Sequence, residues 1–314
     1  MQKQALGIVF SLLLLVTFIG AAPHVGAAIF SLKRSLAATF TSRALPRPVR
    51  FQEREGRGLL VDVWINDVGP YVFAIDTGAG ATIIAPRVAA QARVEPTARE
   101  SQITGLSGRG IVTGTHARIS KLAIGDADNF LPAEGAVIIA PLPRGLDGIL
   151  DPTEAFWPLN YVIDMPAGEL CALDGEEAFA RSREMTVVRW LPDAQGRRPF
   201  VRLANGQRAL LDTGSGLGLA VNSAAARRLG IEPPADGPTD AVLRDLGGGG
   251  INARRIAPAT IALGTMLLRN VPTDFLYGVE AQTPVLLGRD ALRPFRLYFY
   301  ARERLIRIEV PTDG

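Results

Sequence analysis

The chain of 314 residues has few of the side chains that most catalytic and metal sites require. Its one cysteine, Cys171, excludes an internal disulfide, and a lone thiol in a strand is most simply a buried structural residue. Of its two histidines, His24 lies in an apolar N-terminal segment. His116 therefore remains alone in the body of the chain, which excludes a zinc site built from several histidines. We expect no metal and no organic cofactor.

Motifs for other chemistries are incomplete. The Gly-Leu-Ser-Gly stretch at Ser107 lacks the final glycine of a hydrolase nucleophile elbow. The glycines at 247–250 lack the Lys-Ser/Thr of a phosphate-binding loop. The net charge is only +3, and the arginines are spread along the chain without an aromatic-basic stripe. A solvated surface is their simplest role, and nucleic-acid binding is not indicated. Carboxylates are the reactive groups that remain.

Carboxylates do occur in a repeated motif, Asp-Thr-Gly, and each copy follows a short apolar run that is typical of a strand. The surroundings of the motif repeat as well. The paired features are Asp-Thr-Gly at 76–78 and 212–214, a helix-like segment at 87–93 and 223–229, a glycine-rich segment at 103–110 and 246–251, a strand ending in glycine at 121–125 and 259–264, the triplets 149–151 and 286–288, and a closing pair of strands at 161–170 and 297–306. The same order at nearly the same spacing indicates an internal duplication.

Composition and length favour two mainly β domains. Apolar residues make up 47% of the chain, and short runs rich in Val, Ile and Leu alternate with glycine and proline. Such runs predict strands, and helical periodicity is scarce. A chain of this length is long enough for two domains with good cores. We therefore predict homologous lobes at 51–182 and 183–314, with a few short helices.

The aspartates of the two copies, Asp76 and Asp212, are suited to general acid–base hydrolysis. Two carboxylates about 3 Å apart cannot both ionise, so they share one proton; one form activates a water and the other protonates substrate oxygen. Gly78 and Gly214 lack a side chain, which lets a second backbone come close. Ser215 has a hydroxyl that favours an ionised Asp212 by donating to it. Its counterpart in the first half is alanine, so we expect Asp212 to ionise more readily.

With these features the chain resembles the aspartic peptidases, in a bacterial, retropepsin-like form with both lobes in one polypeptide, over roughly residues 51–310. The resemblance implies two lobes related by a pseudo-twofold axis, with Asp76 and Asp212 as the catalytic pair and a water between them. It also implies that Thr77 and Thr213 lock the two active-site loops together. The glycine-rich segments would be flaps over the substrate. Their candidate residues are Gly105, Leu106, Ser107 and Gly108 in one half, and Gly248 and Gly249 in the other.

Two features depart from the family pattern. Asp151 stands where the first lobe should have the glycine of the apolar-apolar-Gly signature, which is intact at 286–288. One interpretation is that Asp tolerates a left-handed backbone, so that the loop still forms; the other is a third carboxylate near the pair. Neither flap contains the tyrosine that pepsin-like enzymes carry in the first. This favours retropepsin-like flaps, or a lid that closes differently.

We predict an aspartic endopeptidase, a hydrolase that binds an extended peptide and acts as a monomer. One alternative is a catalytically inactive descendant that binds peptides or serves envelope assembly, since a fold does not guarantee chemistry. Another is glycoside cleavage, in which carboxylates about 5–10 Å apart flank a sugar. The three tryptophans are scattered rather than gathered in a sugar-stacking run, which disfavours it.

The N-terminus indicates export. Lys3 precedes an uncharged, largely apolar stretch over 4–30 with small residues that offer cleavage points, as in a secretory signal. The stretch is also long enough to span a bilayer if it is not cut. We predict a signal peptide or membrane anchor at 1–27, and a linker or short propeptide at 28–50. The basic residues within 33–50 oppose export. We nevertheless expect a periplasmic or secreted protein, free or tethered by this segment, with no other membrane contact.

Overall fold

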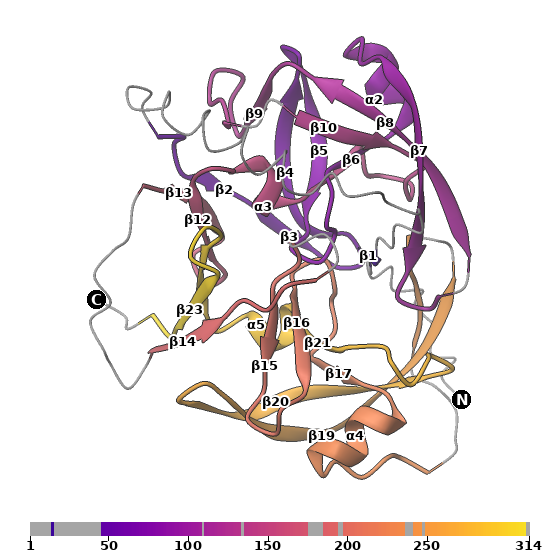
Figure 1. The fold of residues 1–314 in the computed structure, drawn as a ribbon, viewed down its shortest axis with the longest axis vertical. Coiled ribbons are helices and arrows are strands. Elements are labelled where there is room, and N and C mark those ends of the chain that lie inside the picture. The colour runs from indigo at the N-terminus through magenta and orange to yellow at the C-terminus, as the bar shows by residue number, and fades with distance from the viewer. Residues whose placement is uncertain are drawn as a thin grey trace, which may run out of the picture.

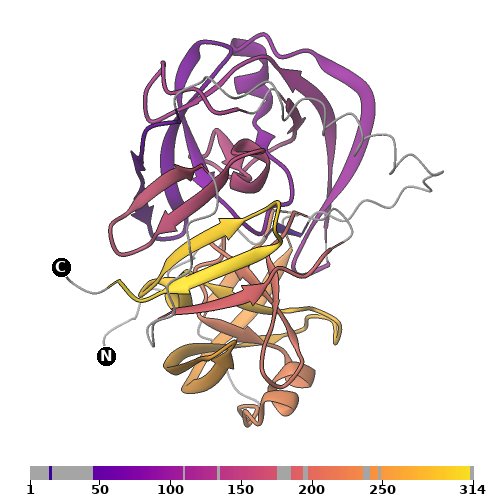
Figure 2. The ribbon, with the colours of Figure 1, turned by 60° about the vertical axis from the view of Figure 1, so that its left-hand side comes forward.

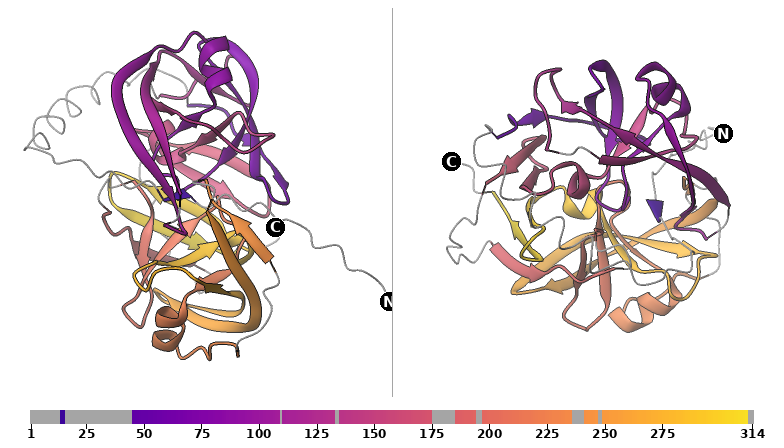
Figure 3. Two further views of the ribbon diagram at one scale, coloured as in Figure 1. Left: turned by 90° about the vertical axis from the view of Figure 1, so that its right-hand side faces the viewer. Right: turned by 45° about the horizontal axis from the view of Figure 1, so that its top comes forward.

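The computed structural model describes residues 14–15, 45–108, 110–132, 135–174, 185–193, 197–235, 241–246 and 249–311. This part of the chain is mainly β. Two lobes lie one above the other, the first indigo to magenta and the second orange (Figures 1 and 3). Within the described residues there are three sheets and four short helices. The mainly β, two-lobed architecture predicted from the sequence is confirmed.

The first lobe is built on a sheet of ten strands. They are β1 (Leu14–Leu15), β3 (Gln52–Arg54), β4 (Gly58–Ile65), β5 (Val68–Ile75), β6 (Ile83–Ile84), β7 (Pro96–Gly105), β8 (Ile111–Ile119), β9 (Leu122–Ile124), β10 (Gly135–Ile139) and β11 (Gly148–Leu150). Their order is β1-β7-β8-β10-β6-β11-β5-β4-β3, and β9 pairs with β4. Alternate residues of β4, from Leu59 to Ile65, are buried. This period of two places one face of the strand in the core.

The second lobe is built on a sheet of seven strands. They are β15 (Phe200–Arg202), β16 (Arg208–Asp212), β17 (Leu219–Val221), β18 (Ala241–Arg244), β19 (Gly250–Leu263), β20 (Met266–Tyr277) and β21 (Val285–Gly288), in the order β15-β16-β21-β17-β20-β19-β18. The first sheet has the corresponding order when it is followed from β4 through β5, β11, β6, β10 and β8 to β7. In both lobes the strand that leads to the aspartate pairs in parallel with β11 or β21, and an antiparallel hairpin, β7–β8 or β18–β19, lies at the matching end of the succession. The internal duplication therefore extends to the sheet topology.

A third sheet joins the lobes. Its six strands are β2 (Val49–Arg50), β12 (Asn160–Asp164), β13 (Glu169–Leu173), β14 (Met185–Arg189), β22 (Arg296–Tyr300) and β23 (Leu305–Glu309), in the order β14-β23-β22-β12-β13-β2. The closing hairpin of each half thus pairs with that of the other, and Figure 2 shows the yellow hairpin between the lobes. Tyr161 lies opposite Phe299, with ring centroids 4.6 Å apart, and both are fully buried.

The helices are short and occur at matched places. They are α2 (Pro86–Gln91), α3 (Pro152–Ala155), α4 (Ser223–Leu229) and α5 (Arg289–Leu292). The Asn222 side chain accepts a hydrogen bond from the backbone of Ala225 at the start of α4, and Gly230 ends the helix with φ 69°. A side-chain oxygen before a helix and a left-handed glycine after it are common end signals. α3 begins one residue after β11, and α5 begins directly after β21.

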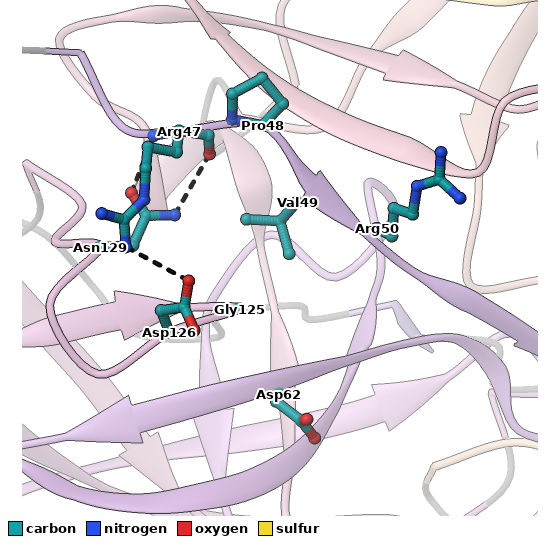
Figure 4. Close-up of a pocket in the computed structure, with 8 residues that line it drawn as sticks. All are labelled: Arg47, Pro48, Val49, Arg50, Asp62, Gly125, Asp126 and Asn129. Carbon is teal, nitrogen blue, oxygen red and sulfur yellow. Dashed lines mark hydrogen bonds and ion pairs between the residues drawn. The ribbon is translucent and has the colours of Figure 1, made fainter.

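Most of the N-terminal segment lies outside the described residues, including nearly all of the predicted signal or anchor and positions 28–44 of the predicted linker. β1 pairs antiparallel with the end of β7, Leu14 opposite Gly105. No described helix is both long and apolar enough to cross a membrane. Where the chain enters the first lobe, Arg47 and Asn129 exchange backbone–amide hydrogen bonds of 2.8 and 3.2 Å beside a pocket of about 260 Å³ (Figure 4).

Candidate active site

The two aspartates stand at equivalent places in the two sheets. Asp76 directly follows β5, and Asp212 is the last residue of β16. Each strand runs parallel to its neighbour, β11 or β21, and the backbone N–H of Asp76 donates to the carbonyl of Leu150 in β11 at 3.0 Å. Both carboxyl groups are buried. The repeat in the sequence therefore places an acid at the same edge of each sheet.

Backbone N–H groups of each loop hold one oxygen of its carboxyl group. Asp76 Oδ1 accepts from Gly78 at 2.8 Å, and Asp212 Oδ1 accepts from Gly214 at 2.9 Å. The Ser215 hydroxyl was predicted to donate to Asp212. Instead, the backbone N–H of Ser215 donates to Asp212 Oδ1 at 3.2 Å, and the hydroxyl accepts from the backbone N–H of Leu217 at 3.3 Å. These bonds leave Oδ2 of each carboxyl group for chemistry.

The glycines of the motif allow the loops to meet. A Cβ atom at Gly78 would lie 2.8 Å from Asp212 Cγ, and one at Gly214 would lie 2.3 Å from Asp76 Cγ. Neither position has space for a side chain, because the carboxyl group of the other lobe lies there. Asp76 and Asp212 are 136 positions apart in the sequence, as are the two threonines that follow them. The structure thus brings together two aspartates that are distant in the chain.

Thr77 and Thr213 bind the loops to each other reciprocally. The backbone N–H of each donates to the hydroxyl of the other at 3.1 Å. The Thr77 hydroxyl donates to the carbonyl of Leu211 at 2.7 Å, and the Thr213 hydroxyl donates to that of Ile75 at 3.1 Å. Both threonines are fully buried. Buried hydrogen bonds of this kind fix geometry, because breaking one leaves a desolvated polar group without a partner.

The environment favours one shared proton on the pair. Burial, and then the charge of Asp212, raise the pKa of Asp76. Burial also raises the pKa of Asp212, but a hydrogen bond with Asp76, the Arg289 guanidinium and the N–H groups of its own loop oppose that rise. Asp212 is therefore the better stabilised carboxylate, and Asp76 the better proton carrier. The two titrate as one unit.

Arg289 is a site residue that the sequence analysis did not identify. It begins α5, is buried, and its Nη1 donates to the carbonyls of Thr213 and Gly214 at 2.8 and 2.9 Å. Its Nε lies 3.3 Å from Glu53 Oε1. The guanidinium therefore stabilises the backbone of the loop that follows Asp212. Its place directly after the apolar-apolar-Gly signature, where the first lobe has Pro152, was the available signal.

The backbone interpretation of Asp151 is wrong. Its φ is −79° and ψ is 104°, which is ordinary extended backbone, so no left-handed conformation has to be tolerated. The side chain instead caps the N-terminus of α3, where Asp151 Oδ1 accepts a hydrogen bond from the backbone N–H of Thr153 at 3.0 Å. Gly288 differs because a Cβ there would lie 2.3 Å from the carbonyl oxygen of Leu217. Only the second lobe needs a glycine at this position.

Asp151 is a third buried carboxyl group beside the pair. Burial, followed by the charge of Glu154, raises the pKa of Asp151 to about 7. The charge of Asp151 in turn contributes to raising the pKa of Asp76. Its neutral form is thus favoured in acid, and its ionisation strengthens proton retention by the pair. No group of three His, Cys, Asp or Glu side chains in the described part of the chain is arranged to hold a metal ion.

Replacing Asp151 by asparagine should change the pH dependence of the protein. The pKa of Asp151 is raised to about 7, so the wild type loses stability as pH rises from about 4 to 7, while the variant does not. At pH 7 the difference in free energy of unfolding is on the order of 4 kcal/mol in favour of the variant. Because a negative neighbour is removed, the alkaline limb of the activity profile should move to lower pH. Thermal melts and pH–rate profiles check both. An unchanged alkaline limb would assign Asp151 to helix capping alone.

The predicted flap residues lie at the tips of the two outer hairpins. Gly105 ends β7, and Leu106, Ser107 and Gly108 follow in the turn towards β8. Gly249 directly precedes β19 in the second lobe, and Gly248 lies outside the described residues. Figures 1 and 3 show the β7–β8 hairpin extending towards the orange hairpin of the second lobe. The structure therefore places the flap tips of both lobes near each other.

Comparison with known proteins identifies the first copy of the motif. Residues 61–150 match the family described as aspartyl protease. The matched segment includes the first Asp-Thr-Gly, the first flap hairpin and the strand that flanks the aspartate. A search of curated proteins found no match to the chain.

Proposed function

We propose, from the match of residues 61–150 to the aspartyl protease family, that the chain is an aspartic endopeptidase with Asp76 and Asp212 as its catalytic pair. The observation that carries this proposal is the interlocking of the two Asp-Thr-Gly loops. Reciprocal bonds of 3.1 Å between Thr77 and Thr213 hold the loops, and each motif glycine leaves space for the opposite carboxyl group. Such an arrangement supports one proton shared by two acids.

In the proposed reaction, the ionised Asp212 removes a proton from a water whose oxygen attacks the scissile carbonyl carbon. The protonated Asp76 donates a hydrogen bond to the carbonyl oxygen as negative charge develops there, and that oxygen takes the proton. The tetrahedral diol then collapses. The C–N bond breaks, the proton gained by Asp212 passes to the leaving nitrogen, and one hydroxyl of the diol returns its proton to Asp76 as the carbonyl re-forms. An extended peptide would lie between the lobes, with its backbone bonded to the flaps like an added strand.

Two alternatives remain to be separated by experiment. An inactive peptide-binding protein would have no need for two buried acids whose pKa values are both raised. Glycoside cleavage needs carboxylates about 5–10 Å apart. The closeness of Asp76 Cγ to the opposite loop, 2.3 Å from the Cβ position of Gly214, favours near contact instead. Both considerations support peptide hydrolysis.

The test is cleavage of a peptide library by the full chain across acidic to neutral pH, mapped by mass spectrometry. We expect cuts at internal peptide bonds, a bell-shaped pH–rate profile, and loss of all cuts with a statine-type inhibitor, which imitates the tetrahedral diol. Peptide binding without any cleavage would establish the inactive alternative. Cuts that persist with the inhibitor and in the Asp212→Asn variant would come from a contaminating protease.

A further inference from the structure

The leucine at the tip of each flap is buried in the opposite lobe. Leu106, from the first lobe, is 5% exposed and belongs to an apolar cluster of the second lobe. Leu246, from the second lobe, is also 5% exposed and belongs to the matching cluster of the first. The cluster that contains Leu106 also contains Leu210, Leu217 and Leu286, and the cluster that contains Leu246 also contains Ala74, Ala81 and Ile149. The exchange follows the pseudo-twofold relation of the lobes.

Both clusters lie beside the aspartates. Ala74 and Leu210 each stand two residues before an aspartate, in β5 and β16. Ile149 and Leu286 stand in β11 and β21, the parallel neighbours of those strands. Each leucine is therefore buried in an apolar cluster that includes residues beside one of the aspartates. These are the positions that side chains flanking a scissile bond would need.

Asp245 ties the two flaps together. Its Oδ2 accepts from the backbone N–H of Ser107 in the first flap at 2.9 Å, and its Oδ1 accepts from that of Gly249 in the second at 2.8 Å. The carboxyl group is 3% exposed. A Cβ atom at Gly105 would lie 1.9 Å from Asp245 Cγ. The closed arrangement thus depends on glycine at 105, because any side chain there displaces the carboxylate.

We propose that Leu106 and Leu246 are internal occupants of the two pockets that flank the catalytic pair, and that a peptide with aliphatic side chains on both sides of the scissile bond displaces them. The inference rests on the proposed function and adds the resting state of that site. The Asp245 carboxylate holds the occupied state closed. Opening requires both leucines to leave their pockets and the Ser107 N–H to leave Asp245.

Emptying the two pockets should raise the apparent affinity of the protein for its peptide substrate. The fraction of molecules that is open limits apparent affinity, so weakening the closed state lowers KM. For a peptide with leucine on both sides of the cut, we expect Leu106→Ala, Leu246→Ala and Gly105→Ala each to lower KM by roughly tenfold. Gly105→Ala removes no apolar contact and acts only by displacing Asp245. The matched control is Ile111→Ala, because Ile111 lies on the same hairpin and is 57% exposed; its KM should stay unchanged.

Hydrogen exchange provides a readout that does not need activity. In the free wild type, the amides of Ser107 and Gly249 should exchange slowly, and Gly105→Ala should speed their exchange without changing the exchange of β12 and β22. Slow exchange in a wild type that cleaves nothing would leave the flap proposal standing and remove the proposed function. Cleavage by the wild type, with KM unchanged or raised in all three variants and fast exchange in the free flaps, would overturn the flap proposal alone.

Discussion

Asparagine in place of either Asp76 or Asp212 is expected to lower kcat/KM for peptide cleavage by about 10³-fold or more, because acid–base catalysis by the pair is lost. An amide neither takes a proton from water nor donates one in the sense that the reaction requires. The two single variants should be equally inactive. The double variant should be no worse than either, since both groups act as one unit.

The same substitutions should leave the fold intact. Asparagine keeps the Oδ1 acceptor that Gly78 holds at 2.8 Å in one loop and Gly214 holds at 2.9 Å in the other. Burial raises the pKa of both acids. Such groups contribute most stability in acid, and the contribution is lost as pH rises through their folded-state pKa values. A neutral amide lacks that loss, so at pH 7 the variants should melt at or above the wild-type temperature.

A matched control is Asp126→Asn on the surface of the first lobe, where the side chain is 72% exposed and pairs with Arg47. Exposed pairs of this kind contribute little, so its activity and melting temperature should match the wild type. Wild-type cleavage by either Asp76→Asn or Asp212→Asn would show that another group catalyses. Loss of activity together with a collapsed melt would reveal a structural role instead.

The pairing of the aspartates could be predicted from sequence because it follows from duplication. Two copies of one strand-loop-strand unit fold alike, so Asp76 and Asp212 reach the same edge of each sheet. The closing hairpins were predictable for the same reason. Their mutual pairing in the sheet that joins the lobes, with Tyr161 opposite Phe299, was not predicted from the sequence.

What could not be predicted depends on contacts between the copies. Leu106 and Leu246 lie in glycine-rich segments, and nothing local shows that each is buried in the other lobe. Whether a side chain fits at the position of Asp151 and Gly288 depends on how closely the neighbouring loop approaches, and at Gly288 a Cβ would lie 2.3 Å from the carbonyl oxygen of Leu217. Arg289 was concealed by composition, since one arginine among many spread along a chain suggests solvated surface.

Arg289→Met is expected to be the most destabilising single change at the site. The guanidinium satisfies the buried carbonyls of Thr213 and Gly214 and pairs with Glu53. Methionine fills a similar volume but leaves these groups without their partner, at a cost of about 3 kcal/mol. For a chain of this size that corresponds to a melting temperature roughly 4–5 °C lower. Lysine should not rescue it, because it lacks the planar guanidinium that directs Nη1 to the two carbonyls and Nε to the carboxylate.

The control is Arg293→Met. Arg293 shares the Glu53 carboxylate at 3.0 Å, but its side chain is 59% exposed, so its loss should change stability by no more than about 0.5 kcal/mol.

Activity distinguishes an electrostatic role of Arg289 from mere packing. Its positive charge opposes the rise in the pKa of Asp212, so removing it raises that pKa, and the acid limb of the pH–rate profile should move to higher pH. In Asp151→Asn, by contrast, the alkaline limb is expected to move to lower pH. An acid limb that stays in place in Arg289→Met, measured below its lowered melting temperature, would mean that Arg289 only supports the loop.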